Sequence, residues 1–183
     1  QELYKTVVDA GVDLFVIRGT TVSAEHVSKT VEPLNLKKFI YELDVPVIVK
    51  SANDVTVMLA EAVAGSETAF VQVMNATAKG LGMTRTNFVN TNGLPDPNQH
   101  TTARDLAKLS RAVVNEYPEY AHYWSAPDVR IGKRRLGSHN ALLKTFPGAD
   151  GLKTGFTCDS GFNVVASATR DGRRLMAVVL GET

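Results

Sequence analysis

Asp150-Gly151-Leu152-Lys153-Thr154-Gly155-Phe156-Thr157 places Lys-Thr-Gly directly after a glycine turn, and an alternating apolar run, 162–168, follows it. This arrangement predicts an edge strand that presents a cation and a hydroxyl to a cleft. Because Gly155 has no side chain, we expect a ligand to approach the backbone closely there. Lys-Thr-Gly alone is a common tripeptide, so its meaning depends on the rest of the chain.

The residues that follow predict a small sheet. The ranges 162–169 and 174–180 alternate or run apolar, and Arg170-Asp171-Gly172-Arg173 separates them. Asp-Gly between two such runs is a strong hairpin signal. We therefore predict three consecutive antiparallel strands, at about 152–158, 162–169 and 174–180.

Upstream of this sheet the apolar residues recur at helical spacing. The sequence predicts one helix from about residue 53 to Gly65, a second that Ser66 caps, and a third that Thr102 opens. Thr102-Ala103-Arg104-Asp105 approximates a capping box with Asp in place of Glu or Gln. The range 90–97 is rich in Asn, Gly and Pro, so we expect an irregular loop. Short strands and a loop are expected after Asp128.

Residues 1–49 have a different pattern, which reads as helix, strand, helix, strand. The short apolar runs 13–17 and 45–49 are typical of strands buried on both faces. Strands that alternate with helices favour parallel pairing. We predict an α/β, mixed α+β protein in two segments, an αβαβ unit over 1–49 and a larger unit over 50–183.

Composition excludes several classes of protein. The chain has 183 residues, 44% hydrophobic and 21% charged, as in a soluble globular protein. A net charge of +1 gives no reason to expect nucleic acid as a partner, and no apolar run approaches the ~20 residues of a membrane span. The first residues lack the features of a signal peptide, so an export signal would lie outside this sequence.

The single Cys158 excludes an internal disulfide and a cysteine zinc cluster. His26, His100 and His122 show no metal-ligand spacing. No cofactor and no metal site are therefore predicted.

Two short motifs stand out: Ser51-x-Asn53 at a predicted helix start and Lys153-Thr154-Gly155 on a predicted strand. Other specific motifs accompany them in a fixed order. These are Lys50-Ser51-Ala52-Asn53-Asp54, Ala60-Glu61-Ala62, Asn92-Gly93-Leu94-Pro95-Asp96, His139-Asn140 and Gly161-Phe162-Asn163. With them, residues 47–183 resemble the D-alanyl-D-alanine carboxypeptidases among the penicillin-binding proteins. The resemblance implies penicillin-binding/β-lactamase-like helices with an antiparallel meander. It also implies action on a peptidoglycan stem peptide or a β-lactam, in a periplasmic or extracytoplasmic location.

The same resemblance implies roles for six residues. Lys153 and Thr154 would seat the free carboxylate of the substrate. Ser51, polarised by a neighbouring lysine, would relay a proton to the leaving amine, and Asn53 would hold the substrate amide or the catalytic lysine. The backbone N–H of Phe156 would be one oxyanion-hole donor. The predicted catalytic residues are thus Ser51, Asn53 and Lys153, and the predicted substrate-binding residues are Thr154, Gly155 and Phe156.

Each of these residues also has a purely structural interpretation. Ser51 is consistent with a simple helix cap, and Lys153-Thr154 with a solvent-facing strand pair. We expect His139 to be a loop hydrogen-bonder rather than a base, and Cys158 to be passive. The aromatic cluster is expected to serve core and surface packing; it comprises Tyr117, Tyr120, Tyr123 and Trp124.

Two stretches of the first 49 residues carry a second resemblance. They are Asp9-Ala10-Gly11-Val12-Asp13-Leu14-Phe15-Val16-Ile17-Arg18-Gly19-Thr20 and the run from Glu32-Pro33 to Pro46-Val47-Ile48-Val49. They are similar to a fragment of the IMP dehydrogenase-related (β/α)8-barrel family. In that family the second strand usually runs into a Gly-Gly turn that helps to hold phosphate, whereas here it runs into Lys50-Ser51. The catalytic cysteine loop is also absent, so we expect a scaffold without chemistry.

The nucleophile of the carboxypeptidase family is the serine of a Ser-x-x-Lys helix. No serine or threonine of this sequence has lysine three residues later. We therefore expect a serine-type D-Ala-D-Ala carboxypeptidase by resemblance that is inactive as written. Two alternatives stay open: a non-enzymatic structural chimera, whether engineered, naturally fused or joined from discontinuous pieces, and an IMP dehydrogenase-like nucleotide enzyme.

Overall fold

The computed structural model describes residues 48–131 and 133–183. The predicted αβαβ unit over 1–49 lies outside the described residues except for its last two. Ile48 and Val49 are helical, so the strand predicted over 45–49 is wrong at both positions. Val49 is fully buried. Periodicity cannot distinguish a short buried strand from a buried piece of helix, which explains the error.

Helices α4 (Asn53–Ala64) and α5 (Glu67–Gly80) begin and end close to the predicted signals. Gly65 follows α4 with φ +81°, and its N–H donates to the carbonyl of Glu61. The Ser66 hydroxyl accepts a hydrogen bond from the N–H of Ala69 at 3.1 Å and so caps α5. Among the described residues no single helix has the length and apolarity to cross a membrane; α4 and α5 meet that test only as a pair, which is bent by 83°.

Helix α6 (Ala103–Glu116) begins where Thr102 caps it, but the predicted capping box is only half formed. The Thr102 hydroxyl accepts from the N–H of Asp105, whereas the Asp105 carboxylate accepts from the N–H of Arg85 and the hydroxyl of Thr86. Burial alone would raise the pKa of Asp105, but these bonds and the ion pair with Lys108 hold it below its ordinary value. Asp105 thus ties the loop before α6 to the helix.

The site lies on a three-stranded sheet formed by β3 (Ala149–Thr157), β4 (Gly161–Arg170) and β5 (Arg173–Glu182). The strands are antiparallel in the order β3-β4-β5, which confirms the predicted meander. Asp171 and Gly172 turn the second hairpin with φ +48° and +72°, as a two-residue hairpin requires. Helix α6 packs against β4 and β5, and β3 is one of the two edge strands of the described sheet.

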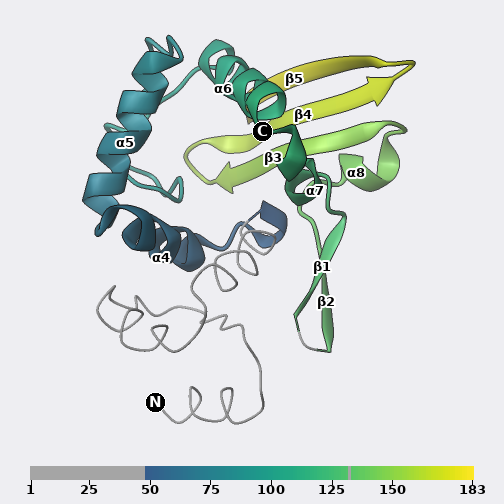
Figure 1. Cartoon of the computed structure of the whole chain (residues 1–183), viewed down its shortest axis with the longest axis horizontal. Helices are drawn as coiled ribbons and strands as arrows, with labels where there is room; N and C mark the ends of the chain where they lie inside the picture. Colours follow the sequence, from purple (N-terminus) through teal and green to yellow (C-terminus); the bar gives the residue numbers. More distant parts are fainter. Residues whose placement is uncertain (1–47, 132) are drawn as a thin grey trace.

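Short elements connect α6 to the sheet. They are η1 (Pro118–Tyr120), α7 (Ala121–Trp124), β1 (Asp128–Ile131), β2 (Arg134–Gly137) and α8 (Leu142–Thr145). Figure 1 shows the antiparallel β1–β2 hairpin extending away from the three-stranded sheet, with α4 and α5 in an arc on the opposite side. The short strands expected after Asp128 are therefore confirmed.

The buried apolar residues come from several elements. In the described chain they are Val49, Val55, Ala60, Ala78, Met83, Val114, Tyr123 and Leu152. Leu152 directly precedes Lys153, so the core fixes the strand that carries the candidate site. Tyr123 is buried and Tyr120 stacks on it at 5.8 Å, whereas Tyr117 and Tyr120 are exposed, as expected for a cluster that packs both core and surface.

Candidate active site

Ser51 and Lys153 meet in the structure. The Lys153 Nζ donates a hydrogen bond to Ser51 Oγ at 2.9 Å, although the two residues are 102 positions apart in sequence. The same Nζ also bonds to the carbonyl of Thr154. The two motifs that the sequence singled out therefore form one polar site, between the start of α4 and the edge strand β3.

The backbone of Ser51 holds its hydroxyl in this position. Ser51 has φ +52°, in the left-handed region, where a residue other than glycine costs about 1–2 kcal/mol. Such residues cluster at functional sites. The alternative that Ser51 merely caps a helix is wrong, because the N-cap of α4 is Ala52 and no side chain caps it. The exposed Ser51 hydroxyl instead faces Lys153.

Lys153 is half-buried, not an ordinary solvent-facing side chain. Burial lowers its pKa below the ordinary value of 10.5, because removal from water disfavours the charged form. An anion bound beside Lys153 would restore the charged form. The lysine is thus suited both to hold a carboxylate and to exchange a proton.

The residues after Lys153 leave an open edge. Thr154 is half-buried, and Gly155 is exposed with no heavy atom within 4 Å of where a Cβ would stand. Phe156 is 57% exposed, and its ring lies 4.5 Å from that of Phe162. In the described sheet β3 pairs only with β4, so its other edge offers backbone groups to an extended ligand.

Asn53 is the first residue of α4 and its side chain is exposed. It lies two residues from Ser51. Asn53 is therefore near the site because it is close to Ser51 in the chain. Within the described chain its amide has no hydrogen-bond partner and is available to a ligand.

His139 and Lys50 also border the site. The sequence predicted His139 to be a loop hydrogen-bonder and gave Lys50 no role. The backbone N–H of His139 donates to the carbonyl of Val49 at 3.3 Å, while its ring is exposed. Burial, then the charges of Lys50 and Lys153, lower the pKa of His139 below 6.5. The signals that could have found them are the words Lys50-Ser51 and His139-Asn140.

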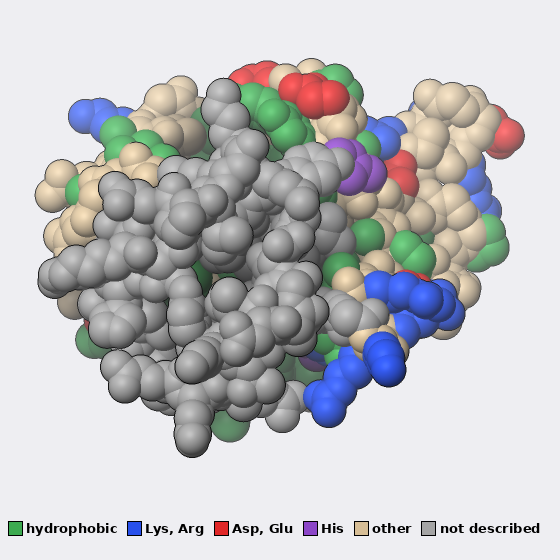
Figure 2. All heavy atoms as spheres, turned by 60° about the horizontal axis from the view of Figure 1, so that its bottom comes forward, with side chains coloured by type: hydrophobic (Ala, Val, Ile, Leu, Met, Phe, Trp, Pro, Cys, Tyr) green, Lys and Arg blue, Asp and Glu red, His purple; other side chains and the backbone are tan. Residues whose placement is uncertain are grey.

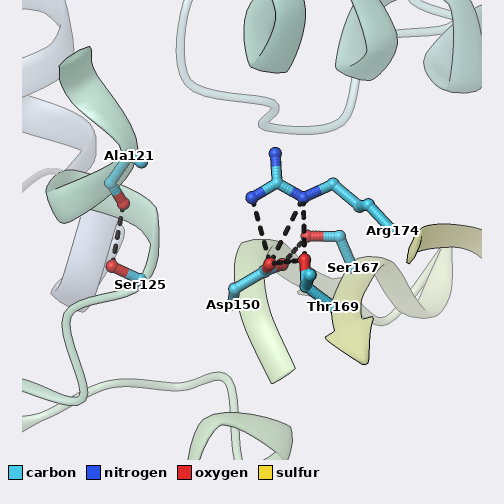
Figure 3. A network of polar contacts seen from close by, with 6 residues as sticks. All are labelled: Ala121, Ser125, Asp150, Ser167, Thr169 and Arg174. Carbon is cyan, nitrogen blue, oxygen red and sulfur yellow. Dashed lines mark hydrogen bonds and ion pairs between the residues drawn. The ribbon is translucent and has the colours of Figure 1, made fainter. Parts of the chain in front are cut away.

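Asp150 organises the start of β3. Figure 3 shows its carboxylate accepting hydrogen bonds from the hydroxyls of Ser167 and Thr169 and pairing with Arg174, whose Nη2 lies 3.1 Å away. The β3–β4 register shifts at Asp150, which is the extra residue of a β-bulge three positions before Lys153. Burial would raise the pKa of Asp150, but these donors hold it below its ordinary value.

Trp124 supports the same strand from α7. A Cβ at Gly151 would lie only 2.9 Å from Trp124 Cδ1, so this close approach requires glycine. The aromatic cluster thus backs the strand that carries Lys153.

A metal site has no support in the described part of the chain. Residues 48–131 and 133–183 contain no group of three or more His, Cys, Asp or Glu side chains that could hold a metal ion. Cys158 is exposed and unpaired. The site offers an amine, a hydroxyl, an amide and a strand edge, which suit the binding of a peptide carboxylate and proton transfer in acyl chemistry.

Comparison with known proteins matches residues 12–183 to the Peptidase S11 family, described as D-alanyl-D-alanine carboxypeptidase. D-alanyl-D-alanine carboxypeptidase DacC of Escherichia coli is 42% identical over 141 residues, which cover 76% of this chain and 35% of the relative. DacA of Haemophilus influenzae is 40% identical over 157 residues, which cover 84% and 40%. The chain therefore spans less than half the length of these relatives.

Solved structures agree with this match. Penicillin binding protein 5 from Haemophilus influenzae has a TM-score of 0.73 at 40% identity and covers 77% of this chain and 42% of its own. Penicillin-Binding Protein D2 from Listeria monocytogenes, in its ampicillin-bound form, has a TM-score of 0.72 at 30% identity and covers 98% and 74%. The predicted fold class, mixed α+β of the penicillin-binding type, is confirmed.

The assignment of residues 1–49 to a separate IMP dehydrogenase-like fragment is not supported. The family match begins at residue 12 and so includes most of this segment, and the comparisons give no support to an IMP dehydrogenase-like fragment or a chimera. The division at residues 49 and 50 stays a prediction.

Proposed function

The chain belongs to the D-alanyl-D-alanine carboxypeptidase family of hydrolases, and from this premise we propose that it carries the substrate-binding side of a serine-type D-Ala-D-Ala carboxypeptidase site. Its ligand would be a peptidoglycan stem peptide that ends in D-Ala-D-Ala, or a β-lactam. Its place of action would be periplasmic or extracytoplasmic, where that polymer lies. The Listeria relative has been solved in ampicillin-bound and cefotaxime-bound forms, which supports a β-lactam as a ligand.

The contact between Lys153 and Ser51 is the observation that carries this proposal. The terminal carboxylate of the peptide is an anion, and the half-buried Lys153 is the cation beside the strand edge. A hydrogen bond to a charged group contributes about 1.5–3 kcal/mol. The Thr154 hydroxyl, on the next residue, would donate a second hydrogen bond to the same carboxylate.

Proton transfer follows from the direction of the same hydrogen bond. Because Lys153 donates to Ser51 Oγ, the hydroxyl proton of Ser51 is left to point elsewhere. We assign it to the leaving amine, with Lys153 resupplying the proton. The lowered pKa of Lys153 favours this step, since a less basic ammonium releases its proton more readily.

The strand edge would hold the peptide itself. An extended substrate would pair with the free side of β3, and the bare backbone at Gly155 allows close approach. We assign the N–H of Phe156 to the oxyanion hole and the exposed amide of Asn53 to the substrate amide. Removing one oxyanion donor typically costs about 2.7–4 kcal/mol of transition-state stabilisation.

Turnover is a separate part of the proposal. The 183 residues contain no Ser-x-x-Lys, so we propose that this chain alone binds the peptide without being acylated. Incubation with a fluorescent penicillin should leave no covalent label after denaturing electrophoresis. A labelled band that boiling does not remove would show that a nucleophile is present.

Binding is tested with two fluorescent peptides that both end in D-Ala-D-Ala, one as the free acid and one as the C-terminal amide. We expect the acid to bind and the amide to bind at least about tenfold more weakly, as the loss of one charged hydrogen bond implies. Equal affinities for the two peptides, or no binding of either, would contradict the proposed carboxylate site.

A further inference from the structure

The β1–β2 hairpin concentrates positive charge. The range 128–137 contains Arg130, Lys133, Arg134 and Arg135 against the single acid Asp128, in a chain whose net charge is only +1. All four basic side chains are exposed. Figure 2 shows Lys and Arg side chains gathered at the lower right of the molecule, on the side of the hairpin. The rest of the chain is therefore slightly acidic, and the basic charge is local.

The register of the hairpin places like charges against each other. Arg130 is directly opposite Arg135, an arrangement that destabilises a strand pair. Asp128 and Arg135 form the one ion pair of the described hairpin, and Asp128 raises the pKa of Arg135. Arg130 and Arg134 form no ion pair among the described residues, although the charge of Arg130 also helps to lower the pKa of Asp128. Violations of such local rules are expected at functional or strained sites, and a bound anion would reduce this repulsion.

The basic hairpin joins the candidate site at its base. The carbonyl of Gly137 accepts a hydrogen bond from Lys50 Nζ at 3.4 Å, and Lys50 directly precedes Ser51. Lys144 Nζ lies 3.6 Å from where a Cβ of Gly137 would stand. At about 3.3 Å per residue, Arg134 lies roughly 10 Å along the strand from Gly137. Cationic side chains thus run from Lys153 through Lys50 to the far part of the hairpin.

We propose that this surface binds further carboxylates of an anionic peptide whose C-terminal carboxylate lies at Lys153. The inference rests on the proposed function and defines its substrate class as acidic peptides. An anionic membrane is the less favoured partner, because neither Val129 nor Leu136 of the hairpin is an exposed large hydrophobic residue. The basic residues extend from the site, as binding along one chain requires.

The test compares two peptides of equal length that both end in a free D-Ala-D-Ala carboxylate. One carries two side-chain carboxylates upstream and the other carries the corresponding amides. We expect the acidic peptide to bind about threefold to tenfold more tightly, as two exposed ion pairs imply. The difference should shrink between ~0.05 M and ~0.5 M NaCl, since salt screens exposed charges.

Variants separate local charge from net charge. The double variant R130Q/R134Q should lose the preference for the acidic peptide, whereas R104Q/R111Q removes two exposed arginines of α6 and should keep it. Equal binding of both peptides to the wild-type chain, or an unchanged preference in R130Q/R134Q, would overturn the inference while the proposed function stands.

An oligo-glutamate with an amidated C-terminus tests the hairpin without the D-Ala-D-Ala site. It should bind weakly to the wild-type chain and not to R130Q/R134Q, even if neither D-Ala-D-Ala peptide binds. No binding of this probe would overturn the inference. Hairpin-dependent binding to phosphatidylglycerol vesicles, with no peptide preference, would also overturn it in favour of a membrane contact.

Discussion

Lys153 donates a hydrogen bond to Ser51 Oγ at 2.9 Å and so joins the edge strand β3 to the segment that precedes α4. The Lys-Thr-Gly strand is common by itself. Its pairing with a serine 102 residues away, in a left-handed backbone conformation, is specific. We expect this pair to act in ligand binding and its surroundings to act in stability.

Lys153→Gln should weaken binding of a D-Ala-D-Ala peptide by about tenfold to a hundredfold, because the charged donor to the carboxylate is lost. Titration calorimetry measures the Kd. Lys79→Gln, at an exposed position of the last turn of α5, is the matched control and should bind as the wild type does. An unchanged Kd in the Lys153 variant would exclude this lysine from the carboxylate site.

Ser51→Gly and Ser51→Ala form a matched pair, since both lose the hydroxyl. With φ +52°, glycine fits the backbone without strain and alanine does not. We expect the glycine variant to be about 1 kcal/mol more stable than the alanine variant in urea unfolding. Equal stability of the two variants would show that the segment relaxes out of the left-handed conformation.

Substitution by alanine should affect peptide binding at Gly155 and the melting temperature at Gly151. At Gly155 a Cβ meets nothing within 4 Å, so Gly155→Ala should leave the melting temperature unchanged and weaken peptide binding at the strand edge. At Gly151 a Cβ would lie 2.9 Å from Trp124, so Gly151→Ala should lower the melting temperature. Tight peptide binding by Gly155→Ala would argue against close approach of a ligand there.

Asp150→Asn should destabilise the protein by about 1–3 kcal/mol, because donors from Ser167, Thr169 and Arg174 lose a charged acceptor. The folded-state pKa of Asp150 lies below 3.8, so its stabilisation is present above that pH and is lost as the pH falls through the lowered pKa. Acid unfolding monitored by circular dichroism should be less steep in the variant. Asp159→Asn, at an exposed position, is the control, and a steepness equal in both variants would contradict the assignment.

His139 should make the protein less stable in mild acid. Its pKa is lowered below 6.5, so between the lowered pKa and 6.5 the unfolded state binds more protons than the folded state. Stability should therefore rise with pH across this window. His139→Gln should remove this part of the pH dependence of the melting temperature, and His122→Gln should not. A steeper dependence in the His139 variant would reverse the inferred sign.

Much of the fold could be predicted because its signals are local. Gly65, Ser66 and Thr102 mark helix ends by their own backbone and hydrogen-bonding preferences, and Asp171-Gly172 specifies a tight hairpin. The strand predicted over 45–49 is wrong at Ile48 and Val49, because a short apolar run fits a buried helix equally well. The capping box at Thr102 is only half formed, because the Asp105 carboxylate bonds to Arg85 and Thr86 in the loop before α6.

Part of the candidate site could also be predicted, because some of its residues lie in local sequence motifs. The sequence motifs predicted Ser51 and Lys153 as site residues, and the structure places their side chains in contact. The left-handed backbone of Ser51, the bulge at Asp150 and the position of His139 depend on tertiary contacts that no local pattern encodes. Asp150 lies within the same stretch as Lys153, yet its hydrogen-bond donors come from β4 and β5.

Chemical-shift mapping by NMR during titration with a D-Ala-D-Ala peptide tests the proposed carboxylate site most directly. We expect the largest shifts at the backbone amides of Ser51, Thr154, Gly155 and Phe156, with smaller shifts when the peptide is the C-terminal amide. Saturable binding with shifts confined to residues away from β3 and the Ser51 segment, or no shifts at all, would contradict the site.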